Sequence, residues 1–592
     1  MTLVALHTPN TTYALRLEES VRPVYWGARR PEDDLGPAGE HAEDFPVASG
    51  CMFGAAALSA ADGPLRLRVA GHEWRDDELV VRLAGDCEVD LHYRVFGDSD
   101  VIERWSVVRH TGRDLLLTDH AAAVWCLPVR ADYRLSHVTG GWARENGLYR
   151  TPVPVAETTL ISRRGVTGHA TNPWVMLDDG TATEDSGEVW SAALAFSGSW
   201  RITVSRTAAG RCAVLGAAGH DRSAVRLAEG DELTSPVFAG LCTTEGFGGA
   251  SRHWHSYQQK HVLPQAEEIR PVFYQAGQVT DGQRELAERA AKLGVELFVV
   301  DDAVPSRLPD GLRPLADHVR SLGMAFGLRV EVRPAGARAF DRLDALIRET
   351  GLAFLEWDCH RTLAEDGPSA RIGHRAGVDE VLDRLRVAHP GVRVEARTGQ
   401  APTGDAMDRL TIQRGYTQVY PPGTMVAWVT DSPNPITGRA VPLRFRFQVA
   451  MAGVLGLGGD LTRWTAAELD EATDLIATYR DIRPVVQHGT LYRLASWIWQ
   501  YQRGDRTVLL AWHVTGAEVH TFVRLRGLDP ARTYRDNAGR TFDGATLLGD
   551  GLPVAFAAGE PAGLLVCLTA QRQDAPSTVQ EDGLTAPPSC SK

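Results

Sequence analysis

Carboxylates that follow predicted buried strands are the residues of this sequence best placed to do chemistry. Asp358 comes after the apolar run 353–355 and Trp357, at the point where the chain turns polar. Asp301 and Asp302 end a second apolar run in the same way. In a sheet of parallel strands the carboxyl ends of the strands face the ligand. We therefore expect these carboxylates at the mouth of one pocket, where they could act as nucleophiles, acids or bases.

Two alternatives to this interpretation stay open. A carboxylate after a strand can also cap the next helix or bond to a loop, and this applies to Asp301 and Asp302. Glu356 precedes Asp358 by two residues, and alternate residues of a strand share one face as long as the strand is regular. In that case the two carboxylates would repel, and one of them could hold a proton and act as an acid.

The elements that must position these residues follow a strand–helix alternation between about 270 and 485. Helices at 283–293, 312–322, 338–349 and 376–388 are each stopped by a glycine or a Pro-Gly pair, and a strand follows each of them. A last helix is expected at 465–481. This alternation is typical of parallel βαβ units and predicts a (β/α)8-type (TIM) barrel. We count seven strands, because the interval between Glu395 and Met407 has no room for a helix and a full strand. An open doubly wound sheet ranks second, since no Gly-rich loop follows the first strand.

The regions on either side of the barrel have the pattern of β-sheets. Residues 1–265 contain short alternating runs between Gly, Asp and Asn clusters, which predicts a β-sandwich larger than a single seven-stranded one. The family resemblance described below implies that it is a β-supersandwich. Residues 486–570 predict a small C-terminal β-sandwich, after the barrel domain at 266–485. The tail at 571–592 is rich in Gln, Ser, Pro and Asp, and we expect it to be disordered. The predicted fold class is α/β plus all-β.

Composition narrows the classes of function. A formal net charge of −13 disfavours nucleic acid and anionic membranes as partners. The N-terminus has neither a basic n-region nor a sustained apolar h-region, so we expect a cytoplasmic protein. The 8 cysteines have no pairing rhythm, which favours reduced thiols. No metal-ligand spacing stands out among the 19 histidines, and we expect neither a metal nor another cofactor.

Several segments resemble one known family. The stretch from Phe354 to Arg361 is similar to the nucleophile strand of large three-domain bacterial α-galactosidases, the retaining family of the glycoside hydrolase 36 type. Further similar segments are 172–174 and 187–198 in the first β-region, and 405–415 and 432–439 in the barrel region. The resemblance covers nearly everything before the tail and implies the three-domain fold predicted above.

The resemblance also implies roles for individual residues. Asp358 occupies the position of the nucleophile, and Asp301 with Asp302 matches a pair of acids after the second strand. The implied partner is a small-molecule glycoside, and self-association into a homo-oligomer stays open. The sugar-binding residues that we predict for this chain are Asp301, Asp302, Glu331, Glu356, Trp357, Arg361 and Arg397.

This chain departs from the family's pattern at the predicted pocket. Glu356 stands where the family has a lysine, and Arg329 stands where it has a tryptophan. Gly277 replaces another tryptophan, and the run 397–400 replaces a cluster of cysteine and glycines. A sandwich loop that carries an aspartate in the family here reads Gly-Cys-Met-Phe at 50–53. These changes predict a pocket that recognises plain galactose poorly.

The family's acid/base aspartate has no direct counterpart. It lies just ahead of the stretch that matches Asp405, where residues 401–404 contain no acid. The second carboxyl group is therefore absent, supplied by Asp405, or supplied from elsewhere, for instance by Glu331 or Glu395. The competing interpretation of Asp405 is an acid at a helix N-terminus. Two functions remain: a divergent glycosidase or transglycosidase on an α-glycoside, and a degenerate scaffold that binds a carbohydrate or a partner.

Overall fold

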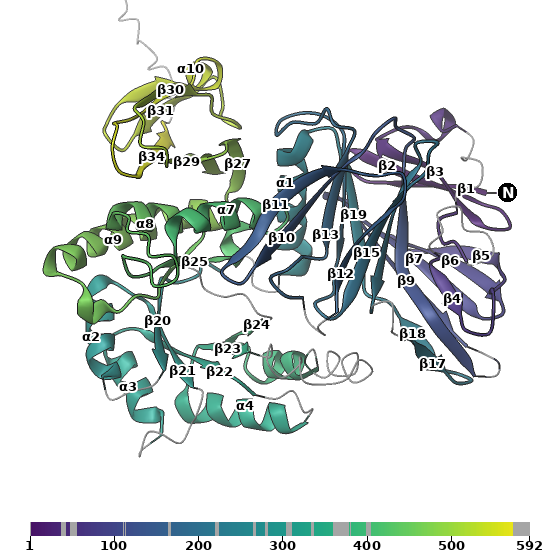
Figure 1. The fold of residues 1–592 in the computed structure, drawn as a ribbon, viewed down its shortest axis with the longest axis horizontal. Coiled ribbons are helices and arrows are strands. Elements are labelled where there is room, and N and C mark those ends of the chain that lie inside the picture. The colour runs from purple at the N-terminus through teal and green to yellow at the C-terminus, as the bar shows by residue number, and fades with distance from the viewer. Residues whose placement is uncertain are drawn as a thin grey trace, which may run out of the picture.

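The protein is arranged as two β-sheet regions on either side of a curled parallel sheet (Figure 1). The computed structural model describes residues 2–36, 43–47, 56–110, 112, 114–163, 167–219, 224–263, 268–278, 282–302, 311–332, 337–358, 378, 380–397 and 404–571. The predicted tail lies almost wholly outside these residues. No helix in the described part of the chain is both long and apolar enough to cross a membrane.

The N-terminal region contains three antiparallel sheets, in the orders β1-β2-β3, β11-β10-β13-β14-β19-β8-β7-β6-β5 (with β18 on β8) and β12-β15-β16-β9-β17 (with β4 on β9). The strands are β1 Thr2–His7, β2 Thr11–Leu17, β3 Val21–Ala28, β4 Leu58–Ala60, β5 Leu67–Arg75, β6 Glu78–Gly85, β7 Glu88–Phe96, β8 Ser99–Arg109, β9 Leu115–Leu127, β10 Arg134–Gly141, β11 Arg144–Pro152, β12 Glu157–Ser162, β13 Trp174–Asp178, β14 Val189–Leu194, β15 Trp200–Arg206, β16 Cys212–Ala218, β17 Val225–Leu227, β18 Glu232–Thr234 and β19 Phe238–Thr243. A 3-10 turn, η1 Glu32–Asp34, follows β3.

A buried ionic cluster lies in the core of this region. Asp44 accepts hydrogen bonds from the hydroxyls of Tyr13 and Tyr93 and pairs with Arg104. The Arg104 guanidinium also lies over the ring of Trp125, 4.7 Å from its centroid. Every charge of the cluster therefore has a partner, which is the condition under which an ion pair can be buried without a large penalty.

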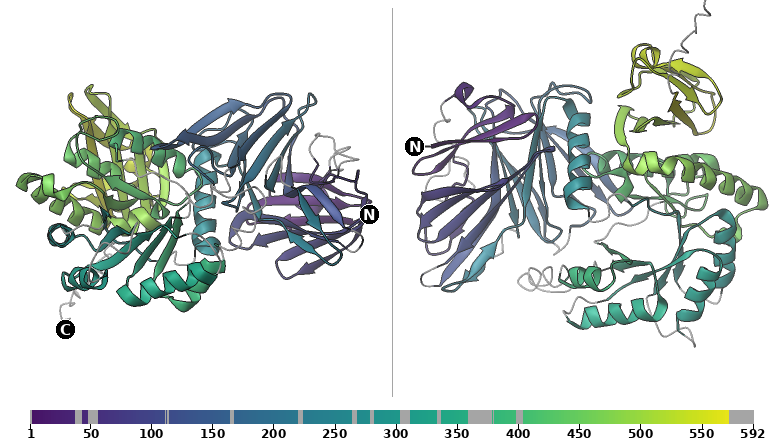
Figure 2. Two further views of the ribbon diagram at one scale, coloured as in Figure 1. Left: turned by 60° about the horizontal axis from the view of Figure 1, so that its bottom comes forward. Right: turned by 180° about the vertical axis from the view of Figure 1, so that it is seen from behind.

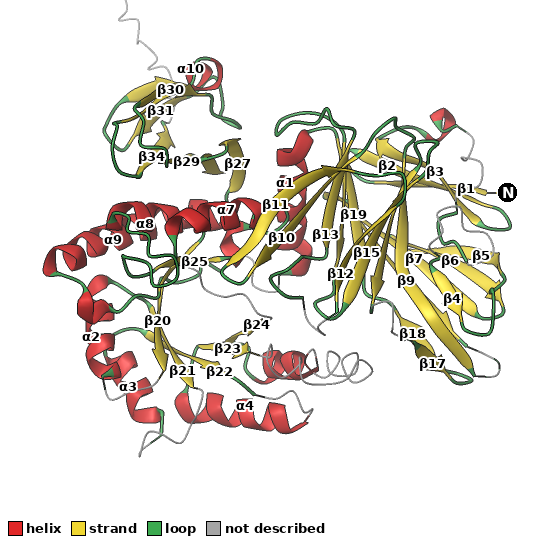
Figure 3. Ribbon diagram, viewed as in Figure 1, coloured by secondary structure: helices red, strands yellow, loops and turns green. Residues whose placement is uncertain are grey.

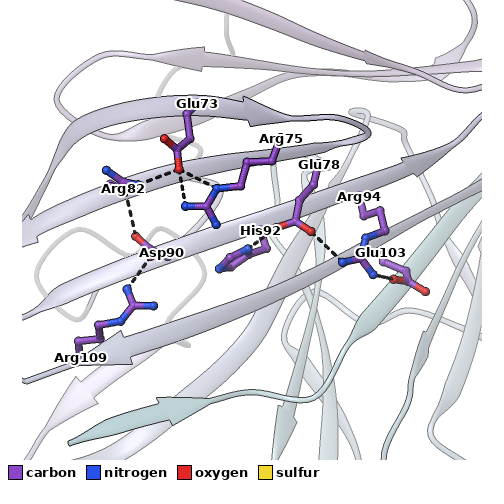
Figure 4. A network of polar contacts seen from close by, with 9 residues as sticks. All are labelled: Glu73, Arg75, Glu78, Arg82, Asp90, His92, Arg94, Glu103 and Arg109. Carbon is purple, nitrogen blue, oxygen red and sulfur yellow. Dashed lines mark hydrogen bonds and ion pairs between the residues drawn. The ribbon is translucent and has the colours of Figure 1, made fainter.

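The exposed face of β5 to β8 carries a ladder of cross-strand charges (Figure 4). Glu73 contacts Arg82, Arg82 contacts Asp90, and Asp90 contacts Arg109, so successive strands alternate in sign. A second row joins Glu78, His92, Arg94 and Glu103. Opposite charges across neighbouring strands favour one register, although each exposed pair contributes only about 0–1 kcal/mol.

Within the described part of the chain, the central sheet has seven parallel strands in the order β24-β23-β22-β21-β20-β26-β25, which agrees with the predicted number. They are β20 Phe273–Gln278, β21 Leu297–Asp302, β22 Ala325–Val330, β23 Phe354–Asp358, β24 Arg393–Arg397, β25 Val426–Val429 and β26 Val454–Leu457. The helices are α1 Gly246–Tyr257, α2 Gln283–Leu293, α3 Arg313–Ser321, α4 Ala337–Thr350, α7 Ala406–Tyr416, α8 Leu443–Ala450 and α9 Ala466–His488, with short turns η2 Gln258–Val262, η3 Pro422–Thr424 and η4 Leu461–Arg463.

The sheet is curled but open between its edge strands β24 and β25 (Figure 1). A cavity of about 400 Å³ lies beside β24, lined among others by Val392, Glu395, Gly423 and Gln487. The irregular unit therefore falls where the sequence predicted it, between the fifth strand and the helix that contains Met407. The helices cover the outside of the curled sheet (Figure 3).

Two elements differ from the sequence prediction. α1 lies within the region predicted as β-structure, and it stands between the N-terminal sheets and the barrel (Figure 2). Its glycines and histidines give it little helix propensity, so its packing on both neighbours determines its conformation. α9 was predicted to end at 481 but continues through Pro484 to His488. Its buried residues Val485 and Val486 extend the packed face past the proline.

The C-terminal region is a small β-sandwich with sheet orders β27-β28-β29-β34-β31-β32 and β30-β33. Its elements are β27 Thr490–Ala495, β28 Ile498–Arg503, β29 Arg506–His513, β30 Val519–Val523, β31 Thr533–Asp536, β32 Thr541–Asp543, α10 Gly544–Gly549, β33 Leu552–Phe556 and β34 Ala562–Ala570. It lies against the helical side of the barrel, where β34 contacts α8 (Figure 1).

Candidate active site

The inner face of the curled sheet changes from apolar to charged along its strands. Near the amino ends, Phe273, Leu297, Val299 and Phe354 form a small core cluster inside the curl. Gly327 belongs to this layer, and a Cβ there would come within 3.0 Å of Val299 and 3.2 Å of Phe354. The apolar layer therefore forms the floor on which the charged residues of the carboxyl ends stand.

β23 places Glu356 and Asp358 on the inner face and Trp357 on the outer one. Trp357 is fully buried within the core between the sheet and its helices, and its indole N–H donates to the carbonyl of Val332 at 2.8 Å. The strand is regular, so the side chains alternate as a pleated strand requires. The structure gives Trp357 a packing position, which corrects the predicted contact with sugar.

The guanidinium of Arg329 lies between three carboxylates. Its Nη2 donates to Asp358 Oδ2 at 2.6 Å, and its Nε lies 3.4 Å from Glu356 Oε1. Its Nη1 lies 3.7 Å from Asp301 Oδ2. The parallel register sets this arrangement, because Arg329 on β22 pairs with Asp301 on one side and with Glu356 on the other.

The contacts of Arg329 with these three carboxylates determine the direction of its pKa shift. Partial burial of Arg329 would lower its pKa, but the hydrogen bond to Asp358 and the charges of Glu356 and Asp301 outweigh burial and raise it. Arg329 is therefore a permanent cation at the carboxyl ends of the strands. The predicted repulsion between Glu356 and Asp358 is offset by a cation that both carboxylates contact.

The other predicted carboxylates lie at different distances from this centre. Asp301 accepts a hydrogen bond from the Gln275 side chain, in addition to its contact with Arg329. Glu331 follows β22 and is exposed. Glu395 pairs with two arginines instead: its Oε1 lies 2.6 Å from Arg270 and 3.1 Å from Arg393. Asp301 thus joins the Asp358 cluster, whereas Glu395 is engaged elsewhere.

Asp405 is the N-cap of α7, which confirms the helix-terminus interpretation of this residue. Its carboxylate accepts from the backbone N–H groups of Met407 at 2.9 Å and Asp408 at 3.2 Å. The Thr437 hydroxyl and the Arg439 guanidinium also donate to the Asp405 carboxylate, and the residue is only 2% exposed. With both oxygens engaged and buried, this geometry disfavours Asp405 as the general acid.

Some predicted residues fall outside the described part of the structure. Arg361 and the loop at 50–53 lie outside it, and for Asp302 and Arg397 only the backbone is described. The backbone of Arg397 pairs with that of Asp358 at the end of β24. Their predicted roles as sugar-binding residues stay predictions.

Comparisons with known proteins cover all three regions of the chain. Residues 72–228 match the glycosyl hydrolase family 36 N-terminal domain, 335–489 match melibiase, and 494–579 match the glycosyl hydrolase family 36 C-terminal domain. The chain belongs to glycoside hydrolase family 36.

Individual family 36 relatives are α-galactosidases. Alpha-galactosidase C of Emericella nidulans is 28% identical over 571 residues, which cover 79% of this chain and 76% of the relative. Alpha-galactosidase AgaA of Geobacillus stearothermophilus is 26% identical over 606 residues, or 85% of this chain and 83% of the relative. The crystal structure of AgaA superposes with a TM-score of 0.89 at 22% identity, over 96% of this chain and 100% of that one. The structural likeness confirms the fold.

Arg329 is the residue of this family 36 site that sequence reasoning recognised only as a departure. Its counterpart in the family pattern is a tryptophan, so the position was not included among the predicted site residues. A signal was nevertheless available in the sequence. Arg329 lies on the predicted strand next to the one on which Glu356 stands in place of the family's lysine. Only the register showed that the two exchanges meet.

The arrangement can support nucleophilic chemistry at a carboxylate. A charge-assisted hydrogen bond from Arg329 holds one oxygen of Asp358 in place. The described acids that share this cation with it are Asp301 and Glu356. The apolar side chains beneath them fill the inside of the curled sheet, so the charged residues lie at the carboxyl ends of the strands.

Proposed function

We propose that this family 36 chain is a retaining glycosidase in which Asp358 is the nucleophile and Arg329 holds it in place. The observation that supports the proposal best is the 2.6 Å bond from Arg329 to Asp358, made while the same guanidinium contacts Glu356. Glycoside hydrolysis of this type requires a carboxylate that attacks the anomeric carbon, and the position of Asp358 at the carboxyl end of β23 supports that role.

The substrate in this proposal is an α-glycoside of a sugar other than plain galactose. Glu356 and Arg329 replace two groups that the family's pattern places against the sugar, a lysine and a tryptophan. A hydroxyl that loses its partner costs about 1–3 kcal/mol, so turnover of simple α-galactosides such as melibiose or raffinose should be slow. Hydrolysis and transfer of the sugar to another acceptor would both start from the same glycosyl-enzyme intermediate.

The test separates the nucleophile from the general acid. Departure of a stable anion needs no proton, so glycosyl fluorides and dinitrophenyl α-glycosides should react even where the acid is weak. Glycosides with poor leaving groups should react far more slowly. Asp358→Asn should abolish both reactions and leave the fold intact. Asp383→Asn, at an exposed position within the helical residues 380–388, should alter neither.

A covalent probe gives an independent answer. A panel of 2-deoxy-2-fluoro α-glycosyl fluorides should label the wild-type protein, and mass spectrometry should place the label on the peptide that contains Asp358. Equal rates for activated and unactivated glycosides would instead reveal a working acid. Absence of label and turnover across the panel would favour the alternative, a scaffold that binds carbohydrate without cleaving it.

A further inference from the structure

The turn between β10 and β11 exposes a large aromatic side chain at a strained position. Gly141 pairs with Arg144, so Trp142 and Ala143 form the turn between them. Ala143 has a φ of 62° and is only 4% exposed, while Trp142 is 64% exposed. A non-glycine residue in the left-handed region costs about 1–2 kcal/mol. A strained position invites the question of a function, and the exposed indole ring of Trp142 is the group at this turn that could contact a ligand.

This hairpin is fixed to the start of α7. Arg144 Nε lies 3.3 Å from Asp408 Oδ2 in the first turn of the helix. Further along, the carbonyl oxygen of Asn146 packs so closely on Gly415 that a Cβ at 415 would come within 1.7 Å of it. The hairpin therefore has a defined place on the barrel, and Trp142 lies two residues from the ionic contact that holds it.

The start of α7 lies on the same rim of the barrel as Asp358. All strands of the central sheet are parallel, so their carboxyl ends meet at one rim, and the helix after β24 begins there. The loop after β25 reaches the same place, because its Arg439 contacts Asp405 and also lies 3.6 Å from Asp408. That loop exposes a second apolar side chain, Ile436, at 48%.

We propose that Trp142 forms an outer sugar-binding subsite for the part of the glycoside that extends beyond the sugar held at Asp358. The face of an indole ring packs against the C–H face of a pyranose, and the neighbouring Arg144 and Asp408 can bond to ring hydroxyls. The inference rests on the proposed function, because it extends that pocket outward. It assigns to the N-terminal domain a share in choosing longer substrates.

The kinetic test compares substrates of two lengths. For Trp142→Ala, kcat/KM for an oligosaccharide should fall about tenfold through a higher KM. The rate with the glycosyl fluoride of the same terminal sugar should not change, because that substrate does not reach the turn. Trp142→Phe should recover most of the loss. Trp74→Ala is the matched control, since Trp74 is 47% exposed but lies on the far strand β5.

A binding measurement separates this inference from the proposed reaction. In the Asp358→Asn background, saturation-transfer NMR with stachyose and isomaltotriose as probes should show contacts that Trp142→Ala removes and Trp74→Ala keeps. Such a result supports the subsite even if the wild-type protein turns over nothing. Identical spectra for the two tryptophan variants, or no transfer to either probe, would overturn the inference.

Discussion

At the scale of single residues, the decisive feature is that Glu356 and Arg329, which both depart from the family's pattern, compensate one another in charge. Glu356 is 8% exposed and would be a costly buried carboxylate next to Asp358 if no cation lay beside it. Arg329 supplies that cation from the neighbouring strand, 3.4 Å from Glu356. Either exchange alone would leave like charges facing each other, so we regard the two as one unit.

This coupling predicts the outcome of a double-mutant cycle. Arg329→Trp alone should destabilise the fold by about 2–3 kcal/mol, because it removes the charged partner of three carboxylates. Glu356→Lys alone should destabilise it as well, by placing an ammonium against Arg329. The double variant should recover most of the stability, as measured by urea denaturation, and should gain activity on p-nitrophenyl α-galactoside. Additive losses in the double variant would contradict the coupling.

At the scale of elements, the open side of the barrel decides which carboxylates reach the site. Among the described strands β24 is one edge of the sheet, and α7 begins at the cap Asp405. An eighth strand that would have carried a carboxylate inward is not among the described elements. The cap instead joins α7 to the loop after β25 through Thr437 and Arg439.

The capping role of Asp405 predicts a specific pattern in its variants. Asp405→Asn keeps a good N-cap and should retain the rate on both activated and unactivated glycosides. Asp405→Ala should destabilise the protein by about 1–2 kcal/mol, because two backbone N–H groups lose their acceptor. Thermal unfolding and steady-state rates measure the two effects. A selective loss of activity on poor leaving groups in Asp405→Asn would identify Asp405 as the acid after all.

At the scale of the whole molecule, the three regions meet at one buried polar junction. Arg493 of β27 donates to the carbonyl of Thr417 at 2.8 Å and to the Ser251 hydroxyl on α1 at 2.7 Å. It also lies 2.7 Å from Glu184 of the N-terminal region. His255 of α1 binds the same Thr417 carbonyl at 3.0 Å. One carbonyl group therefore ties the N-terminal and C-terminal regions to the barrel.

This junction predicts a dependence of stability on pH. Burial, together with the nearby Arg493, lowers the pKa of His255 to about 3 from 6.5. Between these values the unfolded chain binds a proton that the folded chain does not, so stability falls as the pH falls through this window. His255 should contribute a loss of up to about 1.4 kcal/mol per pH unit.

The matched variant for this measurement is His255→Gln. Its amide can donate to the Thr417 carbonyl and carries no titratable group, so the denaturation midpoint should depend less steeply on pH between about 6.5 and about 3. An unchanged pH profile in this variant would show that His255 does not govern the junction.

The sequence by itself determined the number and direction of the barrel strands. Glycines such as Gly294, with a φ of 89°, stop helices through local backbone geometry, and apolar runs of strand length follow them. The same local signals placed Asp358 at the end of β23 and the irregular unit after β24. These features depend on neighbours along the chain, and a pattern of residues can therefore predict them.

Only the tertiary structure decided which side chains meet. The outward position of Trp357 follows from the pleat of β23. The contacts of Arg329 with the neighbouring carboxylates follow from the register of β21, β22 and β23. The conformation of α1 depends on the two regions that it contacts, and the place of Trp142 depends on how the hairpin docks on α7. A contact across strands or domains depends on residues far apart in sequence, because packing rather than local propensity brings them together.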